Sequence, residues 1–458
     1  MTIDPAIFRA YDIRGIVATA LTPQTTELVG QAFGSEAQVQ DQQTVIIARD
    51  GRLSSPMLAK SLAAGLRAAG CDVIDIGLVP TPVLYFATFL LNTGTGIMIT
   101  GSHNPPDYNG LKMMLAGNTL SGDTIQELRQ RIETDDLTTD GNGSFSERDV
   151  VPDYIERIVA DANIARPIKF AVDCGNGAAG EVAVKLFRAL GQQPVELFCD
   201  VDGNFPNHHP DPSKEKNLKD VRAAISEQQL EIGLAFDGDG DRLGVVDANG
   251  QVIWPDRQMI LYSRDILARN SGATIVFDVK CSTHLKKEII DAGGKTVMSK
   301  TGHSFIKKTL KETGAMLGGE MSGHIFFKER WYGFDDGLYA AVRLLEILSQ
   351  DNRSPTEVFA ELPNSVNTPE LNINFAEGEH YRFIDEFKTK AEFAGAEIID
   401  IDGLRAEFAD GWGLVRASNT TPCLVLRFEA DNEAALKRIQ DQFREQIIKL
   451  DDSLQLPF

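Results

Sequence analysis

The chain has 458 residues, 43% of them hydrophobic and 24% charged, which is typical of a globular protein with three or four domains. Its formal net charge of -21 at pH 7 argues against unspecific nucleic-acid binding, because such binding needs clustered Lys and Arg. An anionic substrate would need a local collar of basic side chains and backbone N–H groups.

The sequence pattern predicts neither secretion nor a membrane span. The segment from Met1 to Pro5 has no basic stretch followed by an apolar one, as a signal peptide would. The apolar run from Val83 to Leu91 is much shorter than the ~20 residues that a membrane helix needs. The five cysteines are an odd number without a C-x-x-C pair, which favours a reduced, cytoplasmic setting. No obligatory protein partner is indicated.

Three similar units follow one another along the chain. Each begins with a β-branched run that predicts a buried strand, at residues 44–50, 168–173 and 273–278. A helix-like segment and a second short apolar run come next in each unit. A further apolar strand then opens into an unusual loop, in GIMITGSHNP (96–105), EIGLAFDGDGD (231–241) and GAMLGGEMSGH (314–324). This self-similarity predicts three related α/β domains.

From about Glu370 the pattern changes to short strands, a turn between GWGLVRAS and CLVLRFEA, and a closing helix, which predicts a smaller α+β domain. Ligands of open α/β sheets bind beyond the carboxyl ends of the strands, so the three unusual loops are expected to face one cleft. We therefore expect an α/β protein in which three related mixed α/β domains and a smaller C-terminal α+β domain surround a central cleft. The expected domains cover residues 1–152, 153–254, 255–368 and 369–458.

An acidic loop, FDGDGDR, follows the second of these strands. Its glycines allow a tight turn in which Asp237, Asp239 and Asp241 converge, offering hard oxygen ligands for Mg²⁺ or Ca²⁺. A solvated acidic turn is the simplest alternative. An EF-hand is excluded because its sixth and twelfth positions hold Arg242 and Ala248. A phosphatase of the D-x-D type, with Asp237 as nucleophile, remains a rival interpretation.

A serine turn, TGSHNP, follows the corresponding strand of the first unit. Ser102 on this turn, beside His103, is suited to accept and return a phosphoryl group if a metal ion screens the charge. A hydrolase elbow is excluded because G-x-S-x-G requires glycine where this chain has Asn104. Taken alone, such a turn is more often structural than catalytic.

Two further loops carry groups that can bind a phosphorylated sugar. The carboxylate, hydroxyl and imidazole of GEMSGH can contact sugar hydroxyls, and the Arg, Ser, Asn and Thr of RASNTTP can bind phosphate. Each loop alone is explained as well by an ordinary turn. Single basic residues elsewhere would complete the collar, although each alone is more often a surface charge: Arg14, Lys112, Arg242, Lys280 and His303.

The motifs FRAYDIRG, TGSHNP, DGDGDR, GEMSGH and RASNTTP occur in this order, and together they resemble the α-D-phosphohexomutase superfamily over essentially the whole chain. The bacterial phosphomannomutase/phosphoglucomutase group is the most similar in appearance. The resemblance implies that Ser102 is a phosphoserine. It also implies one Mg²⁺ per chain, held by the Ser102 phosphate, Asp237, Asp239 and Asp241.

The resemblance also implies roles for the remaining motif residues. Groups near the reacting atoms would be Ser102, His103, Lys112 as candidate general base, Arg14, Arg242 and His324. Substrate would be bound by Tyr11, Arg14, Lys280, His303, Glu320, Ser322, His324, Arg416, Ser418, Asn419 and Thr420.

The implied reaction interconverts hexose 1-phosphate and hexose 6-phosphate, with glucose or mannose as the sugar and hexose 1,6-bisphosphate as intermediate and activator. A mutase for another sugar, such as glucosamine phosphate, is the main alternative. More distant alternatives are the D-x-D phosphatase and a cation-binding protein without enzymatic activity.

Overall fold

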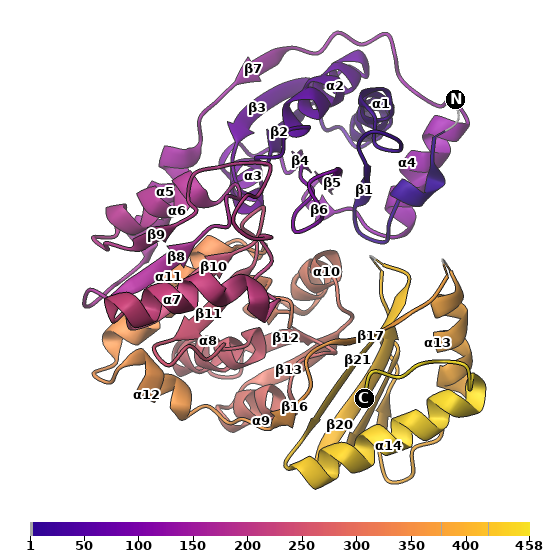
Figure 1. The fold of residues 1–458 in the computed structure, drawn as a ribbon. Coiled ribbons are helices and arrows are strands. Elements are labelled where there is room, and N and C mark those ends of the chain that lie inside the picture. The colour runs from indigo at the N-terminus through magenta and orange to yellow at the C-terminus, as the bar shows by residue number, and fades with distance from the viewer. Residues whose placement is uncertain (1–2, 377, 420) are drawn as a thin grey trace.

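The structure is a computed structural model that describes residues 3–376, 378–419 and 421–458. Four β-sheets with flanking helices follow one another along the chain (Figure 1). The first three sheets combine parallel strands with an antiparallel return strand, whereas the fourth is antiparallel throughout. The prediction of three mixed α/β units followed by an α+β unit is therefore confirmed.

The first unit has a seven-stranded sheet in the order β1-β5-β4-β2-β3-β7, with β6 paired to β5. Helix α1 begins at Pro23 because Thr22 caps it, accepting a hydrogen bond of 3.2 Å from the amide of Thr25. The elements are η1 Pro5–Ile7, β1 Ile13–Ile16, α1 Pro23–Val39, β2 Thr44–Arg49, α2 Ser55–Ala68, β3 Asp72–Leu78, α3 Thr81–Leu90, β4 Gly96–Ile99, β5 Tyr108–Leu115, β6 Asn118–Thr119, α4 Asp123–Glu133 and β7 Phe145–Glu147.

The second unit has a four-stranded sheet in the order β11-β10-β8-β9. All residues of β8, β10 and β11 are buried, in agreement with the continuous apolar runs from which strands were predicted. The elements are α5 Val151–Asp161, β8 Phe170–Asp173, α6 Gly180–Ala189, β9 Val195–Leu197, η2 Glu215–Leu218, α7 Lys219–Gln228, β10 Ile232–Phe236 and β11 Leu243–Asp247.

The third unit has a four-stranded sheet in the order β13-β12-β14-β15. Helix α11 is almost wholly buried, and Asp336 caps it by accepting a hydrogen bond of 2.9 Å from the amide of Tyr339. The elements are α8 Pro255–Arg269, β12 Thr274–Asp278, α9 Thr283–Asp291, β13 Lys295–Ser299, α10 His303–Thr313, β14 Leu317–Gly319, β15 Ile325–Phe327, α11 Gly337–Gln350 and α12 Pro355–Ala360.

The three α/β sheets share one strand order. In each, a central strand (β2, β8 or β12) lies between two parallel neighbours, one of which is β4, β10 or β14. That neighbour turns into an antiparallel return strand, β5, β11 or β15. The turn therefore falls at the same place in all three units. These turns carry Ser102, Asp237 to Asp241, and Glu320 to His324.

The fourth unit has an antiparallel sheet in the order β16-β21-β20-β19-β18, with β17 also paired to β21. Helix α14 crosses this sheet, and its first turn is capped by Asn432, which accepts a hydrogen bond of 3.0 Å from the amide of Ala435 (Figure 1). The elements are β16 Val366–Asn367, β17 Leu371–Asn374, α13 Glu379–Lys390, β18 Glu397–Ile399, β19 Leu404–Phe408, β20 Gly411–Ala417, β21 Cys423–Ala430 and α14 Glu433–Leu450.

The apolar cores show how the units are joined. One buried cluster contains residues of all three α/β units, among them Tyr85, Phe170 and Leu338. The fourth unit has its own core around Phe443, and a small cluster that includes Trp412 connects it to the third unit. The first three units are thus joined by one shared cluster, although the first unit also has a separate core that includes Phe33, while the fourth unit is attached beside them. Among the described residues, no helix combines the length and the apolar character needed to span a lipid bilayer.

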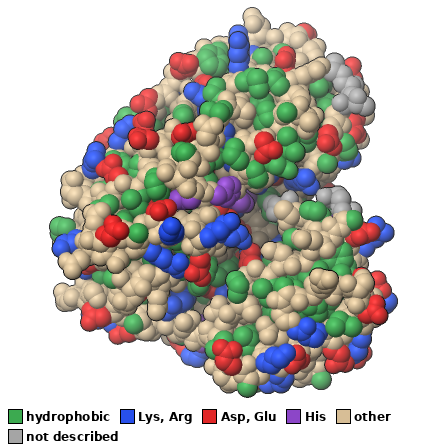
Figure 2. All heavy atoms as spheres, in the orientation of Figure 1, with side chains coloured by type: hydrophobic (Ala, Val, Ile, Leu, Met, Phe, Trp, Pro, Cys, Tyr) green, Lys and Arg blue, Asp and Glu red, His purple; other side chains and the backbone are tan. Residues whose placement is uncertain are grey.

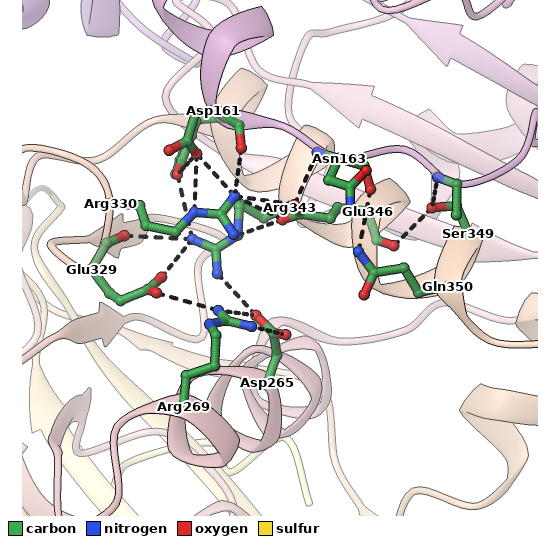
Figure 3. A network of polar contacts seen from close by, with 12 residues as sticks. Asp161, Asn163, Asp265, Arg269, Glu329, Arg330, Arg343, Glu346, Ser349 and Gln350 are labelled. Atoms are coloured by element: carbon green, nitrogen blue, oxygen red, sulfur yellow. Dashed lines mark hydrogen bonds and ion pairs between the residues drawn. The ribbon is translucent and has the colours of Figure 1, made fainter.

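A network of ion pairs reinforces the contact between the second and third units (Figure 3). Arg330 lies 2.9 Å from a carboxylate oxygen of Asp161, at the end of α5, and 2.9 Å from Glu346 in α11. The fully buried Arg343 lies 2.9 Å from Glu329 and 3.2 Å from Glu346. Buried charges remain stable only when they are paired, so this network depends on both units staying in place.

Candidate active site

The three turns and the loop after β20 meet at one cavity of about 790 Å³. In Figure 2, histidine, lysine and arginine side chains gather around a hollow between the upper and lower parts of the molecule. The sequence-predicted residues that line the cavity are Tyr11, Arg14, Ser102, His103, Lys112, Arg242, Lys280, His303, Glu320, Ser322, His324, Arg416, Ser418 and Asn419. Thr420 lies outside the described residues.

Ser102 lies on the turn after β4 and contacts the acidic loop of the second unit. Its Oγ donates a hydrogen bond of 3.1 Å to Oδ2 of Asp237 and lies 3.1 Å from Nδ1 of His103. Burial and the nearby charges of Arg242 and Arg14 hold the pKa of His103 well below its usual value. The imidazole is therefore neutral, and the serine hydroxyl lies between a carboxylate and an uncharged ring.

The acidic loop brings its three carboxylates together as the sequence predicted. Oxygens of Asp237, Asp239 and Asp241 lie within 4.8 Å of one another, and all three residues are fully buried. A side chain at Gly238 would place its Cβ 2.4 Å from the carbonyl oxygen of Ser102, so only glycine allows this close approach. The turn is closed by amides of the loop itself, which donate to Asp237 Oδ1.

This carboxylate cluster fits a hard metal ion. Oδ1 of Asp239 and Oδ1 of Asp241 are buried and form no hydrogen bond with any described residue. Burial and the neighbouring carboxylates hold the pKa of Asp237 well above its usual value, which reflects an excess of negative charge. Buried oxygens without a donor and an uncompensated charge are what a divalent cation would relieve. A metal ion can therefore be held by these three residues.

Lys112 reaches the same cluster from β5. Its Nζ donates a hydrogen bond of 2.7 Å to Oδ2 of Asp239 and forms an ion pair with Asp241. Burial alone would lower the pKa of Lys112, but these two carboxylates hold it well above its usual value. Lys112 is therefore an ammonium group in this arrangement. Thr81 donates a hydrogen bond of 2.6 Å to the same Asp239 oxygen.

His324 is held between two groups that orient its ring. Nε of Arg242 donates a hydrogen bond of 2.9 Å to Nε2 of His324, so Nε2 is the unprotonated nitrogen. The other nitrogen, Nδ1, lies 3.1 Å from Oδ2 of Asp335 and 3.4 Å from Oδ1 of Asp241. The ring proton therefore faces carboxylates, which orients the imidazole toward the acidic loop.

Glu320 and Ser322 lie on the turn after β14, next to the start of α10. Ser322 Oγ donates a hydrogen bond of 3.3 Å to Oε2 of Glu320, and the amide of Gly302 donates to Oε1. Burial raises the pKa of Glu320. His303 is the first residue of α10, and neither ring nitrogen has a hydrogen-bond partner among the described residues. These groups can accept and donate hydrogen bonds to a polyhydroxylated ligand.

Two basic residues of the cavity, Arg416 and Lys280, are each held by an acidic partner. Nε of Arg416 donates a hydrogen bond of 2.8 Å to Asp402, and Nζ of Lys280 donates one of 2.6 Å to Glu370. Tyr11 lies among these groups, and burial raises its pKa to about 12. The partners keep the cationic groups oriented, so the cavity can bind an anion despite the net charge of the chain.

Comparison with known proteins assigns the whole chain to one family. Profiles of phosphoglucomutase/phosphomannomutase alpha/beta/alpha domains I, II and III match residues 5–139, 152–250 and 254–366, and the profile of the C-terminal domain matches residues 370–446. The chain belongs to the phosphoglucomutase/phosphomannomutase family. The predicted membership of the α-D-phosphohexomutase superfamily is thereby confirmed.

Several bacterial proteins of this family are similar to this chain. A phosphomannomutase/phosphoglucomutase of Pseudomonas aeruginosa is 53% identical over 457 residues, covering 100% of this chain and 98% of that protein. A phosphoglucomutase of Neisseria meningitidis is 56% identical over 441 residues, covering 96% of each. The crystal structure of a phosphoglucomutase/phosphomannomutase family protein from Burkholderia thailandensis is 52% identical, covers 100% of both chains and superposes with a TM-score of 0.95.

Several residues that orient the family motifs were not found from the sequence. They are the partners of predicted groups: Thr81 on Asp239, Asp335 beside His324, Asp402 on Arg416, and Glu370 on Lys280. None belongs to a motif with a chemical signature. The one usable signal was position, and it applies only to Thr81, which lies four residues beyond the apolar run CDVIDIG (71–77).

Proposed function

We propose that this protein is a phosphomannomutase/phosphoglucomutase that interconverts hexose 1-phosphate and hexose 6-phosphate through a phosphoserine at Ser102. The contact of Ser102 Oγ with Asp237, at the edge of a cavity that also contains basic and sugar-binding groups, carries the proposal. It is supported by the 53% to 56% identity over nearly the whole chain to enzymes named for these two activities.

In the first step, phosphoserine transfers its phosphoryl group to a free hydroxyl of the bound hexose phosphate. The bond between phosphorus and Ser102 Oγ breaks as the bond from the sugar oxygen forms, and the hydroxyl proton leaves to a base. Lys112 is our candidate for this base. It can accept the proton only as a neutral amine, so its ammonium group must first release a proton, which requires it to leave the carboxylates of Asp239 and Asp241. Arg14 and Arg242 supply positive charge near the transferring group, and transfer depends chiefly on positioning and electrostatic stabilisation.

The product of this step is a hexose 1,6-bisphosphate, which must turn around within the cavity. Its other phosphate then returns to Ser102, leaving the isomeric monophosphate and a regenerated phosphoenzyme. The phosphate that does not react has to be bound in both orientations. Our candidates for this shared site are Arg416, Ser418, Asn419 and Thr420, with Lys280, Tyr11 and His303 beside them.

We propose one Mg²⁺ per chain, held by Asp237, Asp239, Asp241 and an oxygen of the Ser102 phosphate. When bound, it would neutralise the carboxylates and screen the phosphoryl group. The two buried oxygens without a hydrogen bond, on Asp239 and Asp241, support this assignment. The protein itself holds Asp239 in place through Thr81 and Lys112.

Two rival functions are less well supported. A D-x-D phosphatase needs a free oxygen on Asp237 for attack, but both of its oxygens accept hydrogen bonds, Oδ1 from loop amides and Oδ2 from Ser102. A mutase for glucosamine phosphate would use the same cavity. Glu320, Ser322 and His324 would contact the sugar in either case, so the preferred sugar is a matter for measurement.

We also propose that the functional domains follow the expected limits, residues 1–152, 153–254, 255–368 and 369–458. Each of the four sheets begins and ends within one of these ranges, apart from β16 Val366–Asn367, which precedes the last limit and pairs with β21. Each range contributes at least one loop to the cavity.

The test is a turnover comparison with glucose, mannose and glucosamine 1-phosphates, using hexose 1,6-bisphosphate as activator and measuring the 6-phosphate formed. We expect turnover of the glucose and mannose substrates and a phosphate on Ser102 in the intact mass. Release of inorganic phosphate without isomerisation would establish the phosphatase instead. Preference for glucosamine 1-phosphate would change the assigned sugar, and no turnover of any substrate would refute the mutase.

A further inference from the structure

Arg52 gathers the backbone of the Ser102 turn around its guanidinium group. It follows β2 in the segment RDGR, and its side chain is fully buried. One terminal nitrogen donates hydrogen bonds of 2.7 Å and 2.6 Å to the carbonyl oxygens of Ser102 and Asn104. The other donates bonds of 2.5 Å and 3.0 Å to the carbonyl oxygens of Pro105 and Tyr108. A single side chain thus holds four carbonyl groups of this turn.

Asp50 completes the anchor from the other side of the guanidinium. Its Oδ2 lies 3.2 Å from Nε of Arg52 and accepts a hydrogen bond of 3.0 Å from the amide of Gly101. A Cβ at Gly101 would lie 2.4 Å from Cζ of Arg52, so the turn can rest on the guanidinium only with glycine at this position. The two charged residues therefore hold both an amide and the carbonyls around Ser102.

The second unit covers the outer side of this anchor. The ring of Phe205 lies over Cζ of Arg52 with 5.3 Å between Cζ and the ring centroid, a cation–π contact. His209 donates a hydrogen bond to the carbonyl oxygen of His103. This carbonyl lies in the chain between the carbonyls of Ser102 and Asn104, both of which Arg52 binds. The turn is therefore held from two units at once.

The backbone of Ser102 needs such an anchor. Its φ of 49° lies in the left-handed region, which is unfavourable for a residue with a Cβ. Strained conformations at functional sites persist only where the surrounding structure over-determines them. Arg52 does not line the cavity formed by the described residues, so it cannot act by touching the substrate.

We propose that Arg52 is a positioning residue that holds Ser102 in its left-handed conformation for phosphoryl transfer. This inference rests on the proposed function, because it assigns a step of that reaction to the anchor. Lysine would keep the charge but has one nitrogen in place of a planar fork, and therefore cannot hold carbonyls on two sides. The Ser102 oxygen would then lie away from its place beside Asp237, although the rest of the cavity would be unchanged.

The decisive comparison is between Arg52→Lys and a matched control, Arg343→Lys. Arg343 is also fully buried and held by several partners, but it lies in the network between the second and third units (Figure 3). Steady-state kinetics with glucose 1-phosphate are measured at a temperature where circular dichroism shows both variants to be folded. Single-turnover phosphorylation of dephosphorylated enzyme by glucose 1,6-bisphosphate then reports the transfer step directly.

We expect Arg52→Lys to lower kcat and the single-turnover rate by roughly a hundredfold, because a misplacement of about 1 Å can cost that much. KM should change by less than about threefold, since Arg52 does not touch the substrate. Amide hydrogen exchange should accelerate in peptides covering residues 100–110 and nowhere else in the first unit. Arg343→Lys should lower the melting temperature without these changes.

The inference is overturned if folded Arg52→Lys keeps the wild-type kcat. It is also overturned if the substitution raises KM in place of lowering kcat, or if Arg343→Lys lowers kcat by the same factor. Should Arg52→Lys fail to fold, Asp50→Asn weakens the same anchor while keeping the guanidinium, and the same split between kcat and KM is expected. If the wild-type protein shows no mutase activity, the proposed function fails instead. The hydrogen-exchange comparison then still decides whether Arg52 orders the turn.

Discussion

Arg416 offers the sharpest test of the shared phosphate site. It is buried at the end of β20, and its Nε donates a hydrogen bond of 2.8 Å to Asp402, which also accepts one of 3.0 Å from the amide of Thr301. Asp402 therefore fixes the plane of the guanidinium with respect to the cavity. The substitution Arg416→Lys keeps the charge but removes both the planar fork and the contact that orients it.

The expected loss follows from one charge-assisted hydrogen bond to phosphate. Such a bond contributes about 1.5 to 3 kcal/mol. Since each ~1.4 kcal/mol corresponds to a factor of ten, kcat/KM should fall by roughly tenfold to a hundredfold. The fall should be similar for 1-phosphate and 6-phosphate substrates, because one site binds the phosphate that does not react in both half-reactions. More 1,6-bisphosphate should also escape before it has turned around.

The assay measures kcat/KM in both directions and the free bisphosphate released per turnover. Arg438→Lys is the matched control in the same unit, because Arg438 also forms paired contacts with a carboxylate, Asp410, but on the outer helix α14. It should leave both quantities unchanged. A defect of Arg416→Lys confined to one direction, or no defect at all, would refute the shared site.

Further predictions concern the nucleophile, the metal, the base and the effect of pH. Ser102→Ala should show no bound phosphate in intact-mass spectrometry and should lose nearly all turnover. A variant that is still active and phosphorylated would show that another residue is the nucleophile. Excess chelator should stop turnover, and added Mg²⁺ should restore it. Full activity in protein verified to be free of metal would refute the proposed metal site at Asp237, Asp239 and Asp241. Lys112→Met should lower kcat by roughly 10²- to 10⁴-fold with little change in KM, and a wild-type kcat would exclude it as the base. Burial alone would lower the pKa of His208, but its contact of 2.9 Å with Asp173 raises the pKa overall. The ion pair therefore stabilises the folded protein fully below the unfolded pKa of about 6.5. This stabilisation is lost as the pH rises through the folded pKa. The melting temperature of wild-type protein should therefore fall more between pH 6 and pH 9 than that of His208→Gln, and equal falls would contradict this.

Much of the architecture and most of the candidate site were predictable from the sequence. The central strands at residues 44–50, 168–173 and 273–278 are found at Thr44–Arg49, Phe170–Asp173 and Thr274–Asp278. Buried parallel strands need continuous apolar runs, and this requirement is local. The turns that end such strands carry their chemistry in consecutive residues, so Ser102 and the three aspartates could be identified without knowing the packing.

The tertiary structure alone decided which groups hold these residues in place. Lys112 reaches Asp239 across 127 positions of sequence, and Arg52 binds carbonyl groups of the Ser102 turn about 50 positions away. Arg416 depends on Asp402, and Asp335 faces His324, although neither acidic residue belongs to a motif. A buried charge needs a partner, but packing of the units determines which carboxylate or carbonyl lies within reach. Sequence spacing contains no record of that geometry.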